Sequence, residues 1–183
     1  MKKYVLITLI LALIGLSACE TTPSEFTINE SFVGKLSKTT KISELETIYS
    51  KDSIVTNDSI GLKNGSLTSS LLIYDKKGSR LLRLQPKGDS SQTVGSIRIY
   101  DSRYKTDKNI RIGSSFKDLK STGTIDKILP ALNSVSITIK GSSIFYSVDR
   151  NELPDVLKYD RAAIIEALQI PDNATISNIM IQW

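Results

Sequence analysis

The residues best placed to do chemistry lie near the middle of the chain, where Ser114-Ser115-Phe116-Lys117 has the spacing Ser-x-x-Lys. A lysine at this spacing can remove the proton of a serine hydroxyl, so the chemistry needs no histidine. One alternative function is a small hydrolase of the Ser/Lys type that uses Ser115, the residue after the first serine of this motif, with Lys117. The companion motifs of such enzymes are absent, however, and Ser115 with Asp118 also has the spacing of a helix capping box. We favour the cap and assign no catalytic residue.

The composition excludes several other kinds of active site. The 183 residues include no histidine and one cysteine, which removes Ser-His and Cys-His nucleophiles and the usual zinc ligands. No glycine-rich phosphate-binding motif is present either. The 24 basic residues are scattered among 19 acidic ones, so we expect no nucleic-acid partner. We predict no cofactor and no metal site.

The N-terminal segment has the three parts of a bacterial secretory signal. Met1-Lys2-Lys3 is basic, the stretch from Tyr4 to Gly15 is uncharged, and Leu16-Ser17-Ala18-Cys19 ends in the sole cysteine. This ending resembles the lipobox of bacterial lipoproteins, in which the cysteine thiol receives a diacylglycerol and the new amino group receives a fatty acid such as palmitate. The resemblance implies that residues 1–18 are a signal peptide and that Cys19 is the lipid attachment site. The alternatives are an ordinary signal peptide that leaves a free thiol, or an uncleaved anchor.

Residues 19–25 are polar and have little to bury, which predicts a short tether. The lipobox resemblance implies that lipid holds the protein to a membrane. In enterobacteria an aspartate after the lipidated cysteine marks retention in the inner membrane, and here that position is Glu20. We therefore expect the outer membrane, with the protein facing the periplasm of the cell envelope.

Residues 26–183 are predicted to form a single domain of short strands, turns and a few short helices. Ile42, Leu45, Ile48 and Tyr49 recur at spacings of three and four, which predicts a helix over 41–49 capped by Thr40. A second helix is predicted over 160–168, with Ile164, Ile165 and Leu168 facing inward. The strand-like segments between turn signals are 26–28, 32–36, 53–56, 66–74, 80–85, 94–100, 135–140, 143–148 and 179–183.

The second half of the domain begins as the first does. Aligning the two passages places Ile42 against Phe116, Glu44 against Asp118 and Leu45 against Leu119. This similarity suggests two half-repeats, 26–101 and 108–183, although the match is short and a chance likeness is the alternative. The predicted fold class is α+β, mainly antiparallel β-sheet with a few short helices, and duplication would make it two repeated β-α-β-meander units.

Three passages also resemble a known family. They are Val33-Gly34-Lys35-Leu36, the central segments 97–102 and 108–119, and the C-terminal Ile176-Ser177-Asn178-Ile179-Met180-Ile181-Gln182-Trp183. In order and spacing the chain is similar to the small, uncharacterised bacterial lipoproteins typified by enterobacterial YfeY, a domain of unknown function. Some relatives carry a cysteine pair in the second half that this chain lacks. The resemblance implies a lipid-anchored envelope domain and no catalytic residue.

Two groups of side chains have a functional interpretation beside a structural one. Tyr74, Tyr100, Tyr104, Tyr146 and Tyr159 could line a binding groove, but half-buried packing on strands is the commoner role. Basic residues at 35, 38, 41, 76, 77 and 80 could face anionic lipid or polymer, or simply keep the surface solvated. We expect a non-catalytic binding or structural module whose partner is an envelope protein or cell-wall material, bound through a sheet face or its edge loops.

Overall fold

The computed structural model describes residues 25–57, 62–63, 66–67, 69–88, 92–160 and 162–183. The predicted signal peptide, the lipobox with Cys19 and the tether up to residue 24 lie outside the described residues. No helix within these described ranges is long and apolar enough to cross a membrane.

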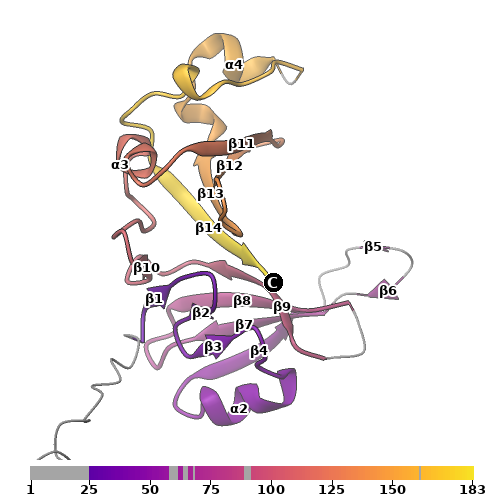
Figure 1. Ribbon diagram of the computed structural model, residues 1–183. Coiled ribbons are helices and arrows are strands. Elements are labelled where there is room, and N and C mark those ends of the chain that lie inside the picture. The colour runs from indigo at the N-terminus through magenta and orange to yellow at the C-terminus, as the bar shows by residue number, and fades with distance from the viewer. Residues whose placement is uncertain (1–24, 58–61, 64–65, 68, 89–91, 161) are drawn as a thin grey trace, which may run out of the picture.

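Eight strands form one large sheet in which every neighbouring pair is antiparallel (Figure 1). Their order across the sheet is β11-β12-β13-β14-β9-β8-β7-β4. The strands are β4 (Ser53–Asn57), β7 (Ser70–Tyr74), β8 (Arg80–Pro86), β9 (Val94–Ile99), β11 (Ile125–Pro130), β12 (Ser134–Ile139), β13 (Ile144–Asp149) and β14 (Ile176–Gln182).

Smaller elements surround this sheet. A four-stranded sheet contains β1 (Thr27–Ile28), β2 (Phe32–Val33), β3 (Leu36–Ser37) and β10 (Lys105–Thr106), and a hairpin joins β5 (Leu62–Lys63) to β6 (Ser66–Leu67). The α-helices are α2 (Leu45–Ile48), α3 (Phe116–Ser121) and α4 (Asp155–Tyr159), with 3-10 turns η1 (Ile42–Glu44), η2 (Arg150–Glu152) and η3 (Ala167–Gln169). The predicted α+β class, mainly antiparallel sheet, is confirmed.

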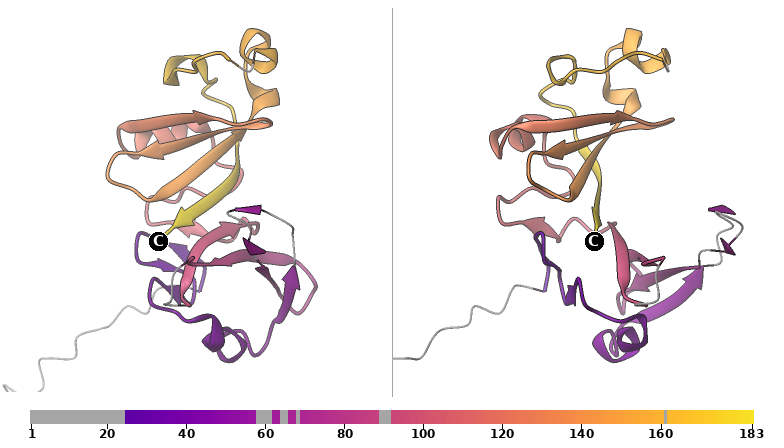
Figure 2. Two further views of the ribbon diagram at one scale, coloured as in Figure 1. Left: turned by 90° about the vertical axis from the view of Figure 1, so that its right-hand side faces the viewer. Right: turned by 45° about the vertical axis from the view of Figure 1, so that its right-hand side comes forward.

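One face of the large sheet packs into the hydrophobic core. Strand alternation places a row of apolar side chains on this face, one from each of the eight strands: Ile54, Ile73, Leu82, Ile99, Ile179, Tyr146, Ile137 and Ile128. All eight belong to the core or pack against it, together with Leu36, Leu45 and Leu119 from the covering elements. In Figure 1 the strands β1–β3 lie in front of β7 and β8, and the turned views of Figure 2 separate the two layers.

The strand order is symmetrical about the contact between β9 and β14. Each half contributes a short helix followed by an antiparallel group of strands, and the last strands of the two groups pair with each other. In the first half, the amide of Ile42 donates to the carbonyl of Gln92 at 3.0 Å. The amide of Val94, which begins β9, donates to the carbonyl of Thr40 at 3.0 Å.

The second half repeats these backbone contacts. The amide of Phe116 donates to the carbonyl of Ala174 at 2.7 Å, and that of Ile176, which begins β14, donates to the carbonyl of Ser114 at 2.8 Å. In each half, therefore, the start of the helix forms the same pair of backbone hydrogen bonds with the chain at the start of the last strand. This symmetry is what a duplicated unit would produce, and the duplication itself stays an interpretation.

Two details of the predicted helices are wrong. The first helix forms over 42–48, but its N-cap is Lys41, and the hydroxyl of Thr40 instead accepts a hydrogen bond from the amide of Ser37 at 2.9 Å. The helix expected over 160–168 is wrong: α4 ends before this range, at Tyr159, and only the 3-10 turn η3 begins within it, at Ala167. Ile165 is buried as predicted, whereas Ile164 and Leu168 are 86% and 93% exposed.

A buried arginine holds this irregular region against the sheet. Arg150 is 4% exposed and follows β13 directly. Its guanidinium donates to three backbone carbonyls, those of Leu157 at 3.1 Å, Ala131 at 3.0 Å and Asp160 at 2.6 Å. One side chain thus joins the β11–β12 turn to α4 and to the residue that follows it.

Candidate functional site

Ser115 and Lys117, the predicted Ser/Lys pair, lie at the start of helix α3. Ser115 is the N-cap of α3: its hydroxyl donates to the carboxylate of Asp118 at 2.7 Å and accepts from the amide of Asp118 at 3.1 Å. The Asp118 carboxylate in turn accepts from the amide of Ser115 at 3.2 Å, which completes the predicted capping box. Lys117 is exposed on the first turn, and no contact between the described residues joins it to Ser115. A hydroxyl that donates to a carboxylate cannot give the same proton to that lysine.

Two of the five tyrosines that could line a groove are buried and serve as packing. Tyr104 and Tyr146 are 2% and 5% exposed, and burial raises the pKa of the Tyr146 phenol to about 12. Tyr104 meets Phe26 edge to face, with ring centroids 5.0 Å apart. Tyr159 projects from α4 and is 80% exposed. The groove hypothesis keeps only Tyr74, at the end of β7, and Tyr100, just after β9. The guanidinium of Arg80, at the start of the intervening strand β8, lies over both rings.

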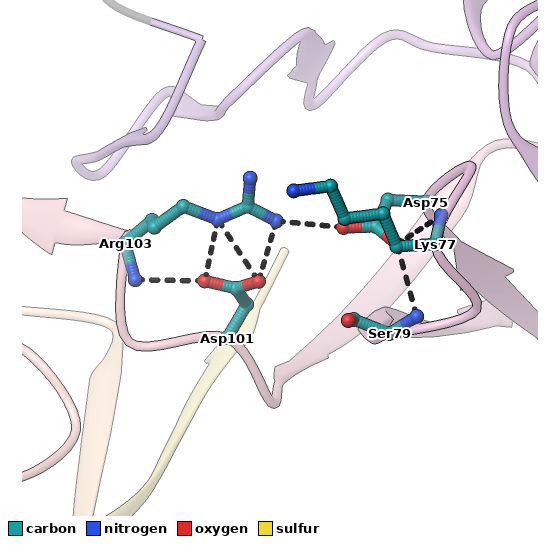
Figure 3. A network of polar contacts seen from close by, with 5 residues as sticks. All are labelled: Asp75, Lys77, Ser79, Asp101 and Arg103. Carbon is teal, nitrogen blue, oxygen red and sulfur yellow. Dashed lines mark hydrogen bonds and ion pairs between the residues drawn. The ribbon is translucent and has the colours of Figure 1, made fainter.

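A cavity of about 370 Å³ lies where the described chain begins, beside Glu25, Tyr49 and Tyr104. Its arginine, Arg103, is neutralised inside the chain: it contacts Asp101 at 2.7 Å and Asp75 at 3.1 Å (Figure 3). Hydrogen bonds from Arg103 are the main reason that the pKa of Asp101 is lowered, and the Ser79 amide is the main reason for Asp75.

Lys35 of the same cavity pairs with Glu25. The Arg103–Asp75 pair joins the loop before β10 to the β7–β8 turn, and the Lys35–Glu25 pair joins the β2–β3 turn to the start of the described chain. We therefore assign them a structural role rather than ligand binding.

A second cavity, of about 210 Å³, lies between the two halves. Glu30, from the turn between β1 and β2, accepts from the hydroxyl of Ser142 at 2.6 Å and from the amide of Ser143 at 2.9 Å. Partial burial, the largest single influence, raises the pKa of Glu30, but these hydrogen bonds and the charge of Lys38 outweigh it and lower the pKa overall. This carboxylate joins the first half to the β12–β13 hairpin of the second.

The remaining candidate is the second face of the large sheet, which we call the open face. It is defined by the row of side chains that alternates with the core row: Val55, Leu72, Arg83, Arg98, Met180, Phe145, Thr138 and Lys127. Of its apolar members only Leu72 is buried, and none of them belongs to the main hydrophobic cluster. The row ranges from buried Leu72 and Thr138 to exposed Arg98 and Val55.

The centre of the open face has a small cavity of about 90 Å³, lined by Arg83, Gln85, Ser96, Arg98 and Met180. Arg83 and Arg98 are paired directly across β8 and β9, and Met180 is paired with Arg98 across β9 and β14. The Arg83 side chain donates to the hydroxyl of Ser70 at 3.0 Å, and the Ser96 hydroxyl donates to Gln85 at 3.0 Å. Neither arginine forms an ion pair with any residue that the structure describes.

Sequence reasoning identified the strands that carry this site but not the site itself. Arg83 and Arg98 lie in the predicted segments 80–85 and 94–100, at positions that alternate with apolar residues. That pattern marks both side chains as facing away from the core. Their pairing depends on the register between β8 and β9, which includes a bulge near Pro86 that no local pattern indicated.

No group of three or more acidic or cysteine side chains within the described ranges could hold a metal ion. The predicted basic face is divided: Lys35 is paired with Glu25, and Arg80 belongs to the aromatic cluster with Tyr74 and Tyr100. Lys41 caps the first helix through its backbone, and its amide donates to Glu44 at 3.1 Å.

No family model and no curated protein matches this chain. Among solved structures, the chain is similar to the crystal structure of the uncharacterized protein YfeY from Escherichia coli, with a TM-score of 0.61 and 20% sequence identity. The similarity covers 86% of this chain and 99% of YfeY. It confirms at the level of the fold the resemblance drawn from the sequence.

Proposed function

We propose that this protein is a lipid-anchored module of the bacterial cell envelope that binds a partner through the open face. The observation that carries the proposal is the difference between the two faces of the large sheet. One face carries an apolar row into the core, whereas the other presents Arg83, Arg98, Met180 and Phe145 outside it. Arg98 is exposed, and Arg83, Met180 and Phe145 are half-buried. A sheet face that carries arginine, methionine and aromatic side chains outside the core resembles a protein-binding surface in composition.

The Ser/Lys hydrolase is not the function that we propose. It depended on Ser115 being free to react with Lys117 as its base, and the capping box engages the Ser115 hydroxyl with Asp118 instead.

The anchor is proposed from the lipobox at residues 16–19. A Cys19→Ser variant has no thiol to accept the lipid, so we expect it to leave the membrane fraction, where the unchanged protein is retained. Stable retention requires more than one acyl chain, because a single chain binds a bilayer only marginally. Intact-mass spectrometry of the detergent-extracted protein checks the same point. The expected mass is that of residues 19–183 plus lipid; a Cys19→Ser variant that stays in the membrane would contradict the anchor.

Binding through the open face can be tested by photo-crosslinking in intact host cells. A benzoylphenylalanine placed at Phe145 lies on the open face, and one placed at Glu46 lies on exposed α2 as the matched control. We expect a crosslinked product from position 145 and none from position 46. Products from position 46 alone, or from neither position, would refute binding through this face.

A further inference from the structure

Arg83 and Arg98 are an unusual pair for the middle of a sheet. They are registered directly opposite each other on β8 and β9, with Met180 next in the row on β14. Directly opposed side chains have Cβ atoms roughly 4.5–5.5 Å apart, and like charges in these positions repel each other. The pairing therefore opposes folding unless another group offsets it.

The described part of the chain provides no such group. The open-face positions of β4, β7, β8, β9 and β14 include no aspartate or glutamate among the residues that the structure describes. Arg103, by contrast, contacts both Asp101 and Asp75 within the chain (Figure 3). Among the described residues, Arg103 is paired with two carboxylates, whereas the neighbouring Arg83 and Arg98 are paired with none.

The two guanidinium groups also border a recess. The cavity of about 90 Å³ between Arg83, Arg98 and Met180 is well below the roughly 300–1,000 Å³ of small-molecule pockets, so its size suits one side-chain head group. Ser70 is buried and accepts from the side chain of Arg83, which holds that guanidinium in place. An arginine that is already ordered loses less conformational entropy when it binds a carboxylate.

We propose that this recess binds a carboxylate side chain, aspartate or glutamate, presented by a protein partner. The inference rests on the proposed function and specifies the partner's chemistry. Arginine recognises carboxylates through two parallel hydrogen bonds, and two arginines around one carboxylate would convert their mutual repulsion into attraction.

The surroundings favour a protein over a lipid or a glycan. Met180 and Phe145 continue the row beyond Arg98, and Arg80 lies over the rings of Tyr74 and Tyr100 at 5.7 and 5.0 Å on the same face. Arginine, methionine, phenylalanine and tyrosine are the residues enriched at the centres of protein interfaces, while lysine is depleted there.

The test is a titration of the full chain in detergent, followed by NMR of the arginine side-chain Nε–H groups. The probe is N-acetylglutamate methylamide, which carries one carboxylate, and the neutral glutamine analogue is its control. We expect saturable shifts at Arg83 and Arg98 with the glutamate probe alone. Arg98→Gln should weaken binding by about tenfold, because a hydrogen bond to a charged group is lost. Arg111→Gln, at an exposed arginine outside the open face, should leave binding unchanged.

Three results would overturn the inference. They are equal shifts with the glutamine analogue, undiminished binding by Arg98→Gln, and tighter binding of inorganic phosphate than of the glutamate probe, which would indicate a phosphate-bearing ligand. Failure of this inference can be distinguished from failure of the proposed function. A crosslink at position 145 together with no carboxylate binding would retain the open face and remove only the assignment of the partner's chemistry.

Discussion

Arg150 shows how much one side chain can determine in this fold. Its guanidinium makes one buried and two partly buried hydrogen bonds to backbone carbonyls near the tip of the second half. We expect Arg150→Met to lower the free energy of unfolding by about 3 kcal/mol, because the carbonyls lose a charged donor. Arg111→Met, at an exposed arginine, is the control and should change it little. Denaturant unfolding measures both variants, and equal effects would contradict the structural role of Arg150.

Ionised Glu30 stabilises the folded protein, and this stabilisation is lost at acid pH. Its pKa in the folded chain lies below the ordinary value of 4.5, so folding favours the ionised carboxylate. This contribution is present above that ordinary value and is lost as the pH falls through the lowered pKa of the folded chain. Glu30→Gln should reduce stability at pH 7 by about 1 kcal/mol through weaker hydrogen bonds to Ser142 and Ser143.

The difference in unfolding free energy between the unchanged protein and Glu30→Gln should shrink as the pH falls below 4.5. Asp75, Asp101 and Asp118 also have lowered pKa values, but they are common to both proteins and cancel in the difference. A difference that stays constant from pH 7 to pH 3 would show that the Glu30 charge contributes nothing.

The sequence predicts the roles of some single residues and not of others. The Ser115–Asp118 cap was predictable because its chemistry is local, three residues apart on one chain segment. The burial of Arg150 was not predictable, because its three acceptors lie on two separate segments of the chain. A basic residue after a strand is ordinarily solvated. The opposition of Arg83 and Arg98 likewise depends on the pairing of two strands and not on either strand alone.

At the scale of elements, the cap of α3 tests the role of Ser115. We expect Ser115→Ala to lower the free energy of unfolding by about 1 kcal/mol, the usual cost of losing an N-cap hydroxyl. Ser115→Asp should recover most of this loss, since aspartate caps helices equally well. Thermal or denaturant unfolding gives both values. A Ser115→Ala variant of unchanged stability would reopen other roles for the hydroxyl.

The prediction of a helix over 160–168 was wrong for a physical reason. Pro154 is the N-cap of α4, which therefore begins earlier, at Asp155. It ends at Tyr159 because Asp160 is extended, with φ −83° and ψ 101°, and its carbonyl accepts from Arg150. The spacing of Ile164, Ile165 and Leu168 suggested a helix, but the tertiary contact of Arg150 outweighed that local preference.

At the scale of the whole molecule, the sequence predicted an antiparallel meander in each half but not how the halves join. The pairing of β9 with β14 brings together strands more than 70 residues apart, and it makes one continuous sheet from two groups. That junction creates the open face, since Arg98 and Met180 are neighbours only across it. Local patterns carry no information about such a pairing, whereas the likeness to YfeY reflects the complete arrangement.

The most direct test of binding through the open face is whether this face is covered in the cell. Met180 lies on this face and is the only methionine after Met1, so its oxidation reports on the face specifically. Hydroxyl-radical footprinting would compare the protein in intact envelopes with the purified protein, using Leu168, 93% exposed near the tip, as the reference. We predict that Met180 is oxidised several-fold more slowly in the envelope while Leu168 reacts equally in both. Equal oxidation of Met180 in both preparations would contradict binding through the open face.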